Sequence, residues 1–107
     1  MLFYDSQNQL STTAQSALAE ITAYIQKHQP TCSRWYAGIA TDPRQRLFSD
    51  HSVAEHGGAW IYRNAGSENG AREVERRLLG KGCRGGCGGG KTPQFVYAYV
   101  ITSSTRE

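Results

Sequence analysis

The sequence predicts an α+β fold in which helices flank a small, mostly antiparallel sheet of three strands. Two observations support this fold class. Segments with the periodicity of an amphipathic helix alternate along the chain with short aromatic and β-branched segments, which are typical of strands. The chain has 107 residues, which is enough for one hydrophobic core and too few for two. We therefore expect a single domain over residues 1–107.

The first helix is predicted at residues 12–28. Apolar residues recur there at steps of three or four, which keeps them on one face of a helix. They are Leu10, Ala14, Leu18, Ile21 and Ile25. Thr12 and Gln15 have the spacing of a capping box at its start. Pro30 disfavours helical angles in the residue before it, so the helix should end there.

A strand at residues 34–40 should lead directly into a helix at residues 43–51. The strand reads RWYAGIA, which is short, aromatic and apolar. Asp42 can cap a helix whose first residue is Pro43.

A second strand at residues 59–63 should precede a helix at residues 70–79. The strand reads AWIYR, and a polar loop separates it from the helix. Asn69 is a good capping residue for that helix, and Gly80 can end it in a left-handed conformation.

In the last part of the chain, the sequence pattern predicts a loop followed by a buried strand. Seven of the eleven residues from 80 to 90 are glycine, which disfavours regular structure because glycine loses the most backbone entropy on ordering. Residues 95–102 read FVYAYVIT and are apolar on both alternate faces, so we place this strand in the middle of the sheet. The order of helices and strands fits an α+β or α/β layer.

Composition and charge narrow the class of protein. With 38% hydrophobic and 20% charged residues, the chain is neither disordered nor fibrous. No apolar run reaches the roughly 18 residues of a membrane span, and no export signal is evident, so we expect a cytoplasmic protein without membrane contact. Residues 63–91 hold seven basic and three acidic residues, which favours a phosphate-bearing partner, although a solvated helix face gives a similar count.

The cysteines predict free thiols. Cys32, Cys83 and Cys87 are an odd number in a chain with no sign of secretion, so a disulfide framework is the less favoured interpretation. A zinc-stabilised interaction domain, with the three cysteines and a histidine as ligands, is a third and less favoured hypothesis, because three residues separate Cys83 from Cys87 and only three cysteines are present.

The most unusual residue is Glu75, which falls inside an apolar helical stripe formed by Ala71, Val74, Leu78 and Leu79. An ionised carboxylate is costly to bury without a partner, so Glu75 must meet an arginine, a metal, a donor network or the edge of a cleft. A structural ion pair with an arginine at the edge of the core is the simplest alternative to a functional site.

Tyr36 and Gly38 lie on the same face of their strand, because side chains alternate with period two. We expect open space beside Gly38, into which the Tyr36 hydroxyl can project; a half-buried core tyrosine is the alternative. Arg46 lies one turn into the following helix, where an arginine is often only surface charge.

These residues resemble motifs of the GIY-YIG nucleases. Tyr36-Ala37-Gly38, followed by Arg46 ten residues after the tyrosine and by His51, resembles the YIG strand and the helix after it. Trp60-Ile61-Tyr62 resembles the third strand of that family, and the helix with Glu75 resembles its metal-binding helix. The similarity covers nearly half of the chain.

The resemblance implies a GIY-YIG-like fold and metal-dependent hydrolysis of phosphodiester bonds in nucleic acid, with DNA favoured over RNA. It places Tyr36 near the nucleophilic water and Arg46 on the scissile phosphate, with His51 as a looser match. Glu75 becomes the sole protein ligand of one Mg²⁺ or Mn²⁺ ion. Mg²⁺ keeps several waters and needs few carboxylates, and a guanidinium can hold two phosphate oxygens, so the chemistry is consistent.

One signature of the family is missing, since no Gly-Ile-Tyr strand precedes Tyr36 and the nearest tyrosine, Tyr24, lies in the first predicted helix. The last strand, with Tyr97 and Tyr99 on one face, could take its place in the sheet; a plain core strand is the alternative. The loss of that tyrosine leaves a second functional hypothesis, a catalytically degenerate module that binds nucleic acid or protein. In either case Arg44, Arg84 and Lys91 are predicted to contact nucleic acid.

Overall fold

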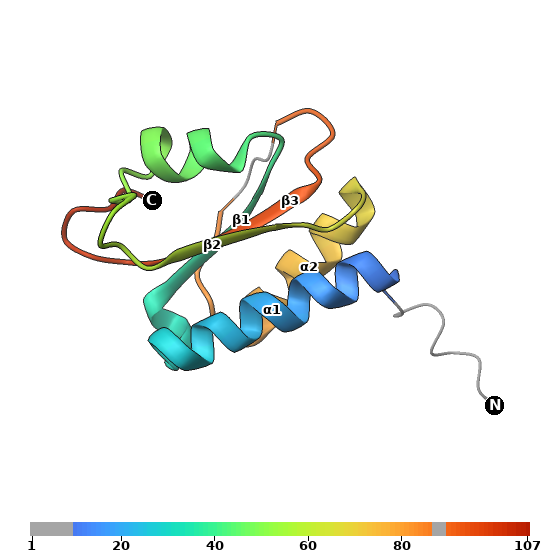
Figure 1. Cartoon of the computed structure of the whole chain (residues 1–107), viewed down its shortest axis with the longest axis horizontal. Helices are drawn as coiled ribbons and strands as arrows, with labels where there is room; N and C mark the ends of the chain where they lie inside the picture. Colours follow the sequence, from blue (N-terminus) through green and yellow to red (C-terminus); the bar gives the residue numbers. More distant parts are fainter. Residues whose placement is uncertain (1–9, 87–89) are drawn as a thin grey trace.

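The computed structural model describes residues 10–86 and 90–107, and it confirms the predicted α+β class with a three-stranded antiparallel sheet (Figure 1). Helices and strands follow one another in the predicted order. They are α1 (Thr12–His28), the 3₁₀ turn η2 (Cys32–Arg34), β1 (Trp35–Ala40), the π-helix η3 (Gln45–Asp50), β2 (Trp60–Asn64), α2 (Glu68–Gly80) and β3 (Phe95–Val100). In the described part of the chain no helix is long and apolar enough to cross a membrane.

The C-terminal strand β3 lies in the middle of the sheet, between β1 and β2, and pairs antiparallel with both. This confirms the central position predicted from its apolar character on both faces. Tyr97 lies opposite Gly38 of β1, and Tyr99 lies opposite Tyr36. Because residues two apart share a face, all three tyrosines lie on the same side of the sheet.

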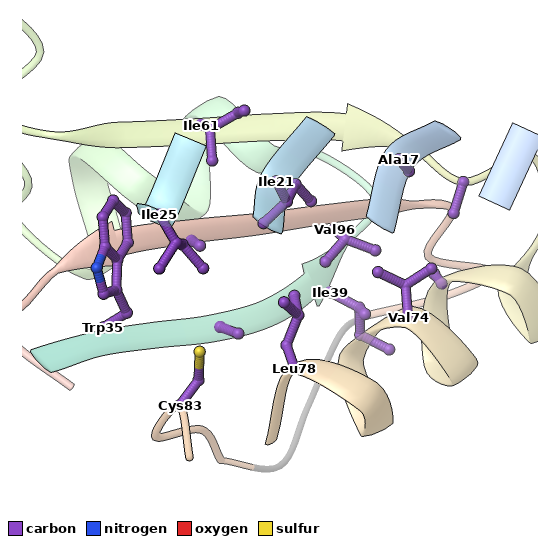
Figure 2. Packing of buried hydrophobic residues seen from close by; sticks show 14 of the residues in the cluster. Ala17, Ile21, Ile25, Trp35, Ile39, Ile61, Val74, Leu78, Cys83 and Val96 are labelled. Carbon is purple, nitrogen blue, oxygen red and sulfur yellow. The ribbon is translucent and has the colours of Figure 1, made fainter. Parts of the chain in front are cut away.

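The two faces of the sheet are covered by different elements (Figure 1). Helices α1 and α2 cover one face, where aliphatic side chains form the larger core cluster. Figure 2 shows this cluster, with Ile21 and Ile25 from α1 and Leu78 from α2 directed towards the strands. The opposite face is covered by η3, from which Leu47 packs against the tyrosines. The aliphatic layer stabilises the fold, and the aromatic layer contains most of the polar side chains that are buried.

Helix α1 has the predicted bounds, but its capping residue differs from the prediction by one position. Ser11, rather than Thr12, caps the helix, and its hydroxyl accepts a hydrogen bond from the Ala14 N–H at 3.1 Å. The predicted cap of the second helical segment is confirmed, since Asp42 accepts a hydrogen bond from the Gln45 N–H at 3.1 Å. That segment then continues as a π-helix, which the sequence pattern did not predict.

Helix α2 begins earlier than predicted, at Glu68, and its cap is Ser67 rather than Asn69. The Ser67 hydroxyl accepts a hydrogen bond from the Gly70 N–H at 2.9 Å. Gly80 is still helical, and the left-handed conformation falls on Gly82, with φ of 111°. Both ends were predicted within two residues, which is the usual uncertainty when several cap residues follow one another.

Part of the predicted glycine-rich loop docks on the outer edge of β1. The Arg84 N–H donates to the Trp35 carbonyl at 2.8 Å, and the Ala37 N–H donates to the Arg84 carbonyl at 2.8 Å. The next residue must be small, because a Cβ on Gly85 would lie 2.7 Å from Leu79 Cδ2. This contact covers an edge strand that would otherwise present free backbone groups.

The two adjacent leucines of α2 offer a matched test of this core. Leu78 is fully buried between α2 and the sheet, whereas Leu79 is 38% exposed. We expect Leu78→Ala to lower the free energy of unfolding by about 2–5 kcal/mol, because it removes buried apolar surface and leaves a cavity. Leu79→Ala should cost about 1 kcal/mol or less. Urea unfolding of both variants measures the difference, and equal losses would contradict this packing of α2.

Candidate functional site

Tyr97 is the centre of a buried polar cluster on the aromatic face of the sheet. Its side chain is fully buried and crosses β1 at Gly38, where an added Cβ would lie 2.5 Å from the Tyr97 hydroxyl oxygen and 2.6 Å from Cζ. The prediction of open space beside Gly38 is therefore wrong. The space exists because glycine has no side chain, but the tyrosine of the neighbouring strand fills it.

His51 holds the Tyr97 hydroxyl in place. Its Nδ1 lies 2.7 Å from the Arg106 carbonyl oxygen, which can only accept, so Nδ1 carries the proton. Its Nε2 lies 2.8 Å from the Tyr97 hydroxyl and, in this tautomer, accepts that hydrogen bond. Burial lowers the pKa of His51, and the nearby Arg46 charge lowers it further, against the raising effect of the Arg106 hydrogen bond. His51 is therefore neutral at pH 7.

Arg46 approaches the same hydroxyl from η3. The Arg46 carbonyl accepts a hydrogen bond from the His51 N–H at 2.9 Å across five residues, and this π-helical turn brings both side chains towards Tyr97. Burial raises the pKa of Tyr97, while the nearby Arg46 guanidinium acts in the opposite direction. The buried Nε of Arg46 lies 3.3 Å from an Asp50 carboxylate oxygen, but without the geometry of a hydrogen bond.

Glu75 differs from the other two acids of α2 in having no ion pair. Arg72 pairs with Glu68 at 2.8 Å, and Glu73 pairs with arginines on the next turn. Within residues 10–86 and 90–107, no basic side chain lies within ion-pair distance of Glu75. The structural ion pair considered above is thus not found there. Burial raises the pKa of Glu75, and the Arg72 charge partly offsets this effect.

Tyr36 lies within the aromatic cluster rather than at an open cleft. It is 6% exposed, and its ring stacks on Tyr99 with centroids 5.3 Å apart and lies 4.7 Å from the ring of His51. The glycine-rich segment covers its hydroxyl, because a Cβ on Gly86 would lie 2.9 Å from that oxygen. Of the two interpretations of Tyr36, the buried one describes this conformation.

Three of the four principal residues predicted from sequence lie around the Tyr97 side chain. The Tyr36 ring stacks 6.4 Å from the Tyr97 ring, His51 bonds to the Tyr97 hydroxyl, and the charge of Arg46 acts on that hydroxyl from η3. Glu75 acts on Tyr97 only through its charge, which is the smallest of the effects on the pKa of Tyr97. Arg46 is also at the surface: it lines a hollow of about 280 Å³ together with Ala40, Thr41, Asp42, Gln45, Asp50 and Gly90. A ligand in this hollow would reach the guanidinium without entering the core.

The three other basic residues that were predicted to contact nucleic acid lie outside this cluster. Arg44 is exposed, forms an ion pair with Glu55 and lies over the Phe48 ring at 5.0 Å. Arg84 pairs with Glu107 at 3.1 Å. The backbone carbonyl of Lys91 accepts a hydrogen bond from Thr41, and its side chain is exposed. None of these contacts tests the predicted role.

Sequence reasoning missed the central role of Tyr97 and the part played by Arg106. The alternation in FVYAYV does place Tyr97 and Tyr99 on one face, which is a usable signal. Nothing in the sequence shows that Gly38 is the residue opposite Tyr97. No sequence pattern identifies the backbone carbonyl of Arg106 as the partner of His51, because any residue at that position could supply a carbonyl.

The described residues contain no metal site built from several protein side chains. Among residues 10–86 and 90–107, no group of three or more histidine, cysteine, aspartate or glutamate side chains is arranged to hold a metal ion. Cys32 and Cys83 are free thiols, and Cys87 lies outside the described residues. A metal with a single protein carboxylate would need only Glu75.

Comparison with family models, with curated proteins and with solved structures gives no match to this chain. The proposals below therefore rest on the residues and on their arrangement.

The contact between Gly38 and Tyr97 can be tested with two glycine variants. Gly38→Ala should destabilise the protein by about 1–3 kcal/mol, because the new methyl group overlaps the tyrosine ring. Gly80→Ala is the matched control: it adds the same methyl group where no described atom outside the neighbouring helix backbone lies within 4 Å, and it should stabilise the helix end by up to about 1 kcal/mol. Opposite signs in urea unfolding are expected, and a neutral Gly38→Ala would contradict this position of Tyr97.

The lowered pKa of His51 makes stability depend on pH. Above its ordinary pKa of 6.5 the histidine is neutral in the folded and the unfolded chain, so stability is at its full value. As the pH falls through 6.5, the unfolded chain takes up a proton that the folded chain binds more weakly. The free energy of unfolding should therefore decrease on acidification from about pH 7.5 to about pH 5.

The variant His51→Gln isolates this effect, because it keeps a hydrogen-bonding side chain that does not titrate. Urea unfolding at a series of pH values should give a shallower slope for His51→Gln than for the parent chain. Identical slopes would show that His51 is not the group responsible.

Proposed function

We propose that this chain is a metal-dependent nuclease that hydrolyses phosphodiester bonds in nucleic acid, with DNA favoured over RNA. The observation that supports it is that His51 bonds to the hydroxyl of Tyr97 and that the charges of Arg46 and Glu75 both act on this hydroxyl. A cation for phosphate, a neutral base and an acid without an ion pair among the described residues are groups that this reaction uses.

Glu75 is the proposed ligand of one Mg²⁺ or Mn²⁺ ion. Its carboxylate is half-buried, its pKa is raised by burial, and it has no ion pair among the described residues. A divalent cation would restore the electrostatic stabilisation that burial removes. Mg²⁺ keeps several of its waters, so one carboxylate is a sufficient protein contribution. When bound, the ion would polarise the phosphate and lower the pKa of a bound water.

Arg46 is the proposed phosphate clamp. Its side chain is 27% exposed and faces the hollow beside η3, while its buried Nε lacks a hydrogen-bond acceptor in the described residues. A phosphate in this hollow can accept two hydrogen bonds from a guanidinium in a fixed, planar geometry. Asp50 competes for the same cation, so phosphate binding should displace the Arg46–Asp50 contact.

His51 and Tyr97 form the proposed proton path. Because Arg106 fixes the His51 tautomer, Nε2 is free of a proton and can accept the one on the Tyr97 hydroxyl. Tyr97 can then take a proton from an attacking water. The tyrosine therefore does not have to persist as a phenolate, a form that its raised pKa disfavours. In this scheme Tyr97 supplies the tyrosine that is missing ahead of Tyr36 in the sequence.

The second candidate is a module that binds nucleic acid without cutting it. One observation favours it: Tyr97 and Tyr99 are fully buried and Tyr36 is 6% exposed, so water reaches the tyrosine cluster poorly in this conformation. In that case the cluster would serve to hold Arg46 at the surface. The two functions differ in their need for Glu75, since phosphate binding by Arg46 does not require a metal.

Two glutamates of α2 allow a direct test. Glu75→Gln should reduce Mg²⁺- or Mn²⁺-dependent nicking of supercoiled DNA by at least about 100-fold, because it removes the metal ligand. Glu73→Gln changes the same charge on the same helix at an ion-paired position, and it should leave nicking unchanged. Glu75→Gln should also not lose stability at pH 7, since a carboxylate with a raised pKa is destabilising when ionised.

The possible outcomes separate the two functions. Salt-dependent DNA binding without nicking in the parent chain would favour the binding module. Equal nicking by the parent chain and by Glu75→Gln would exclude Glu75 as the metal ligand. A marked loss of thermal stability in metal-free Glu75→Gln would instead identify Glu75 as a structural residue.

A further inference from the structure

Two cysteines that are far apart in the sequence meet at one end of β1. Cys32 lies in η2, directly before that strand, and is partly exposed. Cys83 lies in the turn after α2, directly before Arg84, whose N–H bonds to the Trp35 carbonyl at 2.8 Å. That pairing returns the chain to the start of β1, and Figure 2 shows the sulfur of Cys83 directed towards the strand.

The two cysteines are close neighbours. Both residues pack on the aliphatic cluster beneath the sheet, and the Cys32 thiol contributes to raising the pKa of Cys83. The residue before Cys83 is close as well, because a Cβ on Gly82 would lie 3.7 Å from the Cβ of Cys32. The backbone segments that carry the two cysteines thus run side by side.

The environments of the two thiols differ. Cys83 is 6% exposed, and burial, with a further contribution from Cys32, raises its pKa to about 12. It stays protonated at neutral pH and is shielded from solutes. Cys32 is the thiol that faces solvent. An oxidant should therefore react first at Cys32, with Cys83 held beside it as the second thiol.

We propose that Cys32 and Cys83 are a redox modification site, at which a hydroperoxide converts the thiol pair into a reversible disulfide. The Cys32 thiolate attacks a peroxide oxygen; the sulfur–oxygen bond forms, the oxygen–oxygen bond breaks, and the leaving oxygen takes a proton. Cys83 then loses its proton and attacks the sulfenic sulfur, so that the sulfur–sulfur bond forms and water leaves. Two electrons from the thiols reduce the peroxide, and a small thiol restores the reduced pair.

The disulfide would close a loop over residues 33–82, which contains β1, η3, β2 and α2. It would also hold residues 84–86 on the edge of β1, above Tyr36. This site does not depend on the proposed nuclease activity, because both cysteines lie on the aliphatic side of the sheet and neither contacts Tyr97. Closing a long loop lowers the conformational entropy of the unfolded chain. The melting temperature of the oxidised form should therefore be on the order of 10 °C higher than that of the reduced form.

The test uses the full chain with Cys87→Ser, which removes the third thiol. After treatment with hydrogen peroxide and alkylation of the remaining thiols, digestion and mass spectrometry should identify one peptide pair joined through Cys32 and Cys83. The intact mass should be about 2 Da below that of the reduced chain, and dithiothreitol should reverse both changes. Thermal melting of the oxidised and reduced forms should show the expected rise in Tm.

The matched control adds Cys32→Ser to Cys87→Ser, at a position where the side chain is partly exposed and a hydroxyl is tolerated. It should fold, form no intramolecular crosslink and show no rise in Tm with peroxide. Full alkylation of Cys32 and Cys83 after peroxide would overturn the proposal. A product of the parent chain joined mainly through Cys87, or mainly between two chains, would overturn it as well.

Discussion

The close packing of the Tyr97 ring on Gly38 is the contact on which the polar cluster depends. Because Gly38 has no side chain, the ring can cross β1 and bring its hydroxyl to His51, directly after η3. A buried hydroxyl needs a hydrogen-bond partner, and His51 provides one, while the charge of Arg46 acts on the hydroxyl from η3. The tautomer of His51 is set in turn by the Arg106 carbonyl. The cluster thus joins the central strand, the π-helix and the C-terminal segment.

The two faces of the sheet differ in the kind of side chain that they bury. The face under α1 and α2 is aliphatic and needs no polar partners, so it can stabilise the fold by burial alone. The face under η3 buries tyrosines and a histidine, whose polar atoms must be matched one by one. Glu75 belongs to the first layer by its helix, and only its charge acts on Tyr97 of the second.

The proposed nuclease site combines two charged side chains, Arg46 and Glu75, that are incompletely paired. Arg46 is satisfied only partly by Asp50, and Glu75 has no ion pair in the described residues, although the same helix pairs its other acids with arginine. Such incomplete pairing is costly for a fold and useful for a site that must bind a phosphate and a metal. The glycine segment over Tyr36 approaches so closely because Gly86 has no side chain.

The sequence by itself determined the order of helices and strands, and it singled out several residues of the candidate site. Local periodicity predicted α1 at its observed bounds, and apolar residues on both faces placed β3 mid-sheet. Motif spacing and the apolar stripe identified Arg46 and Glu75, whose charges both act on the Tyr97 hydroxyl. Only the tertiary structure decided that Tyr97 fills the space at Gly38 and that residues 84–86 cover β1. A period of two assigns each strand residue to a face, but register and neighbours depend on contacts between distant segments.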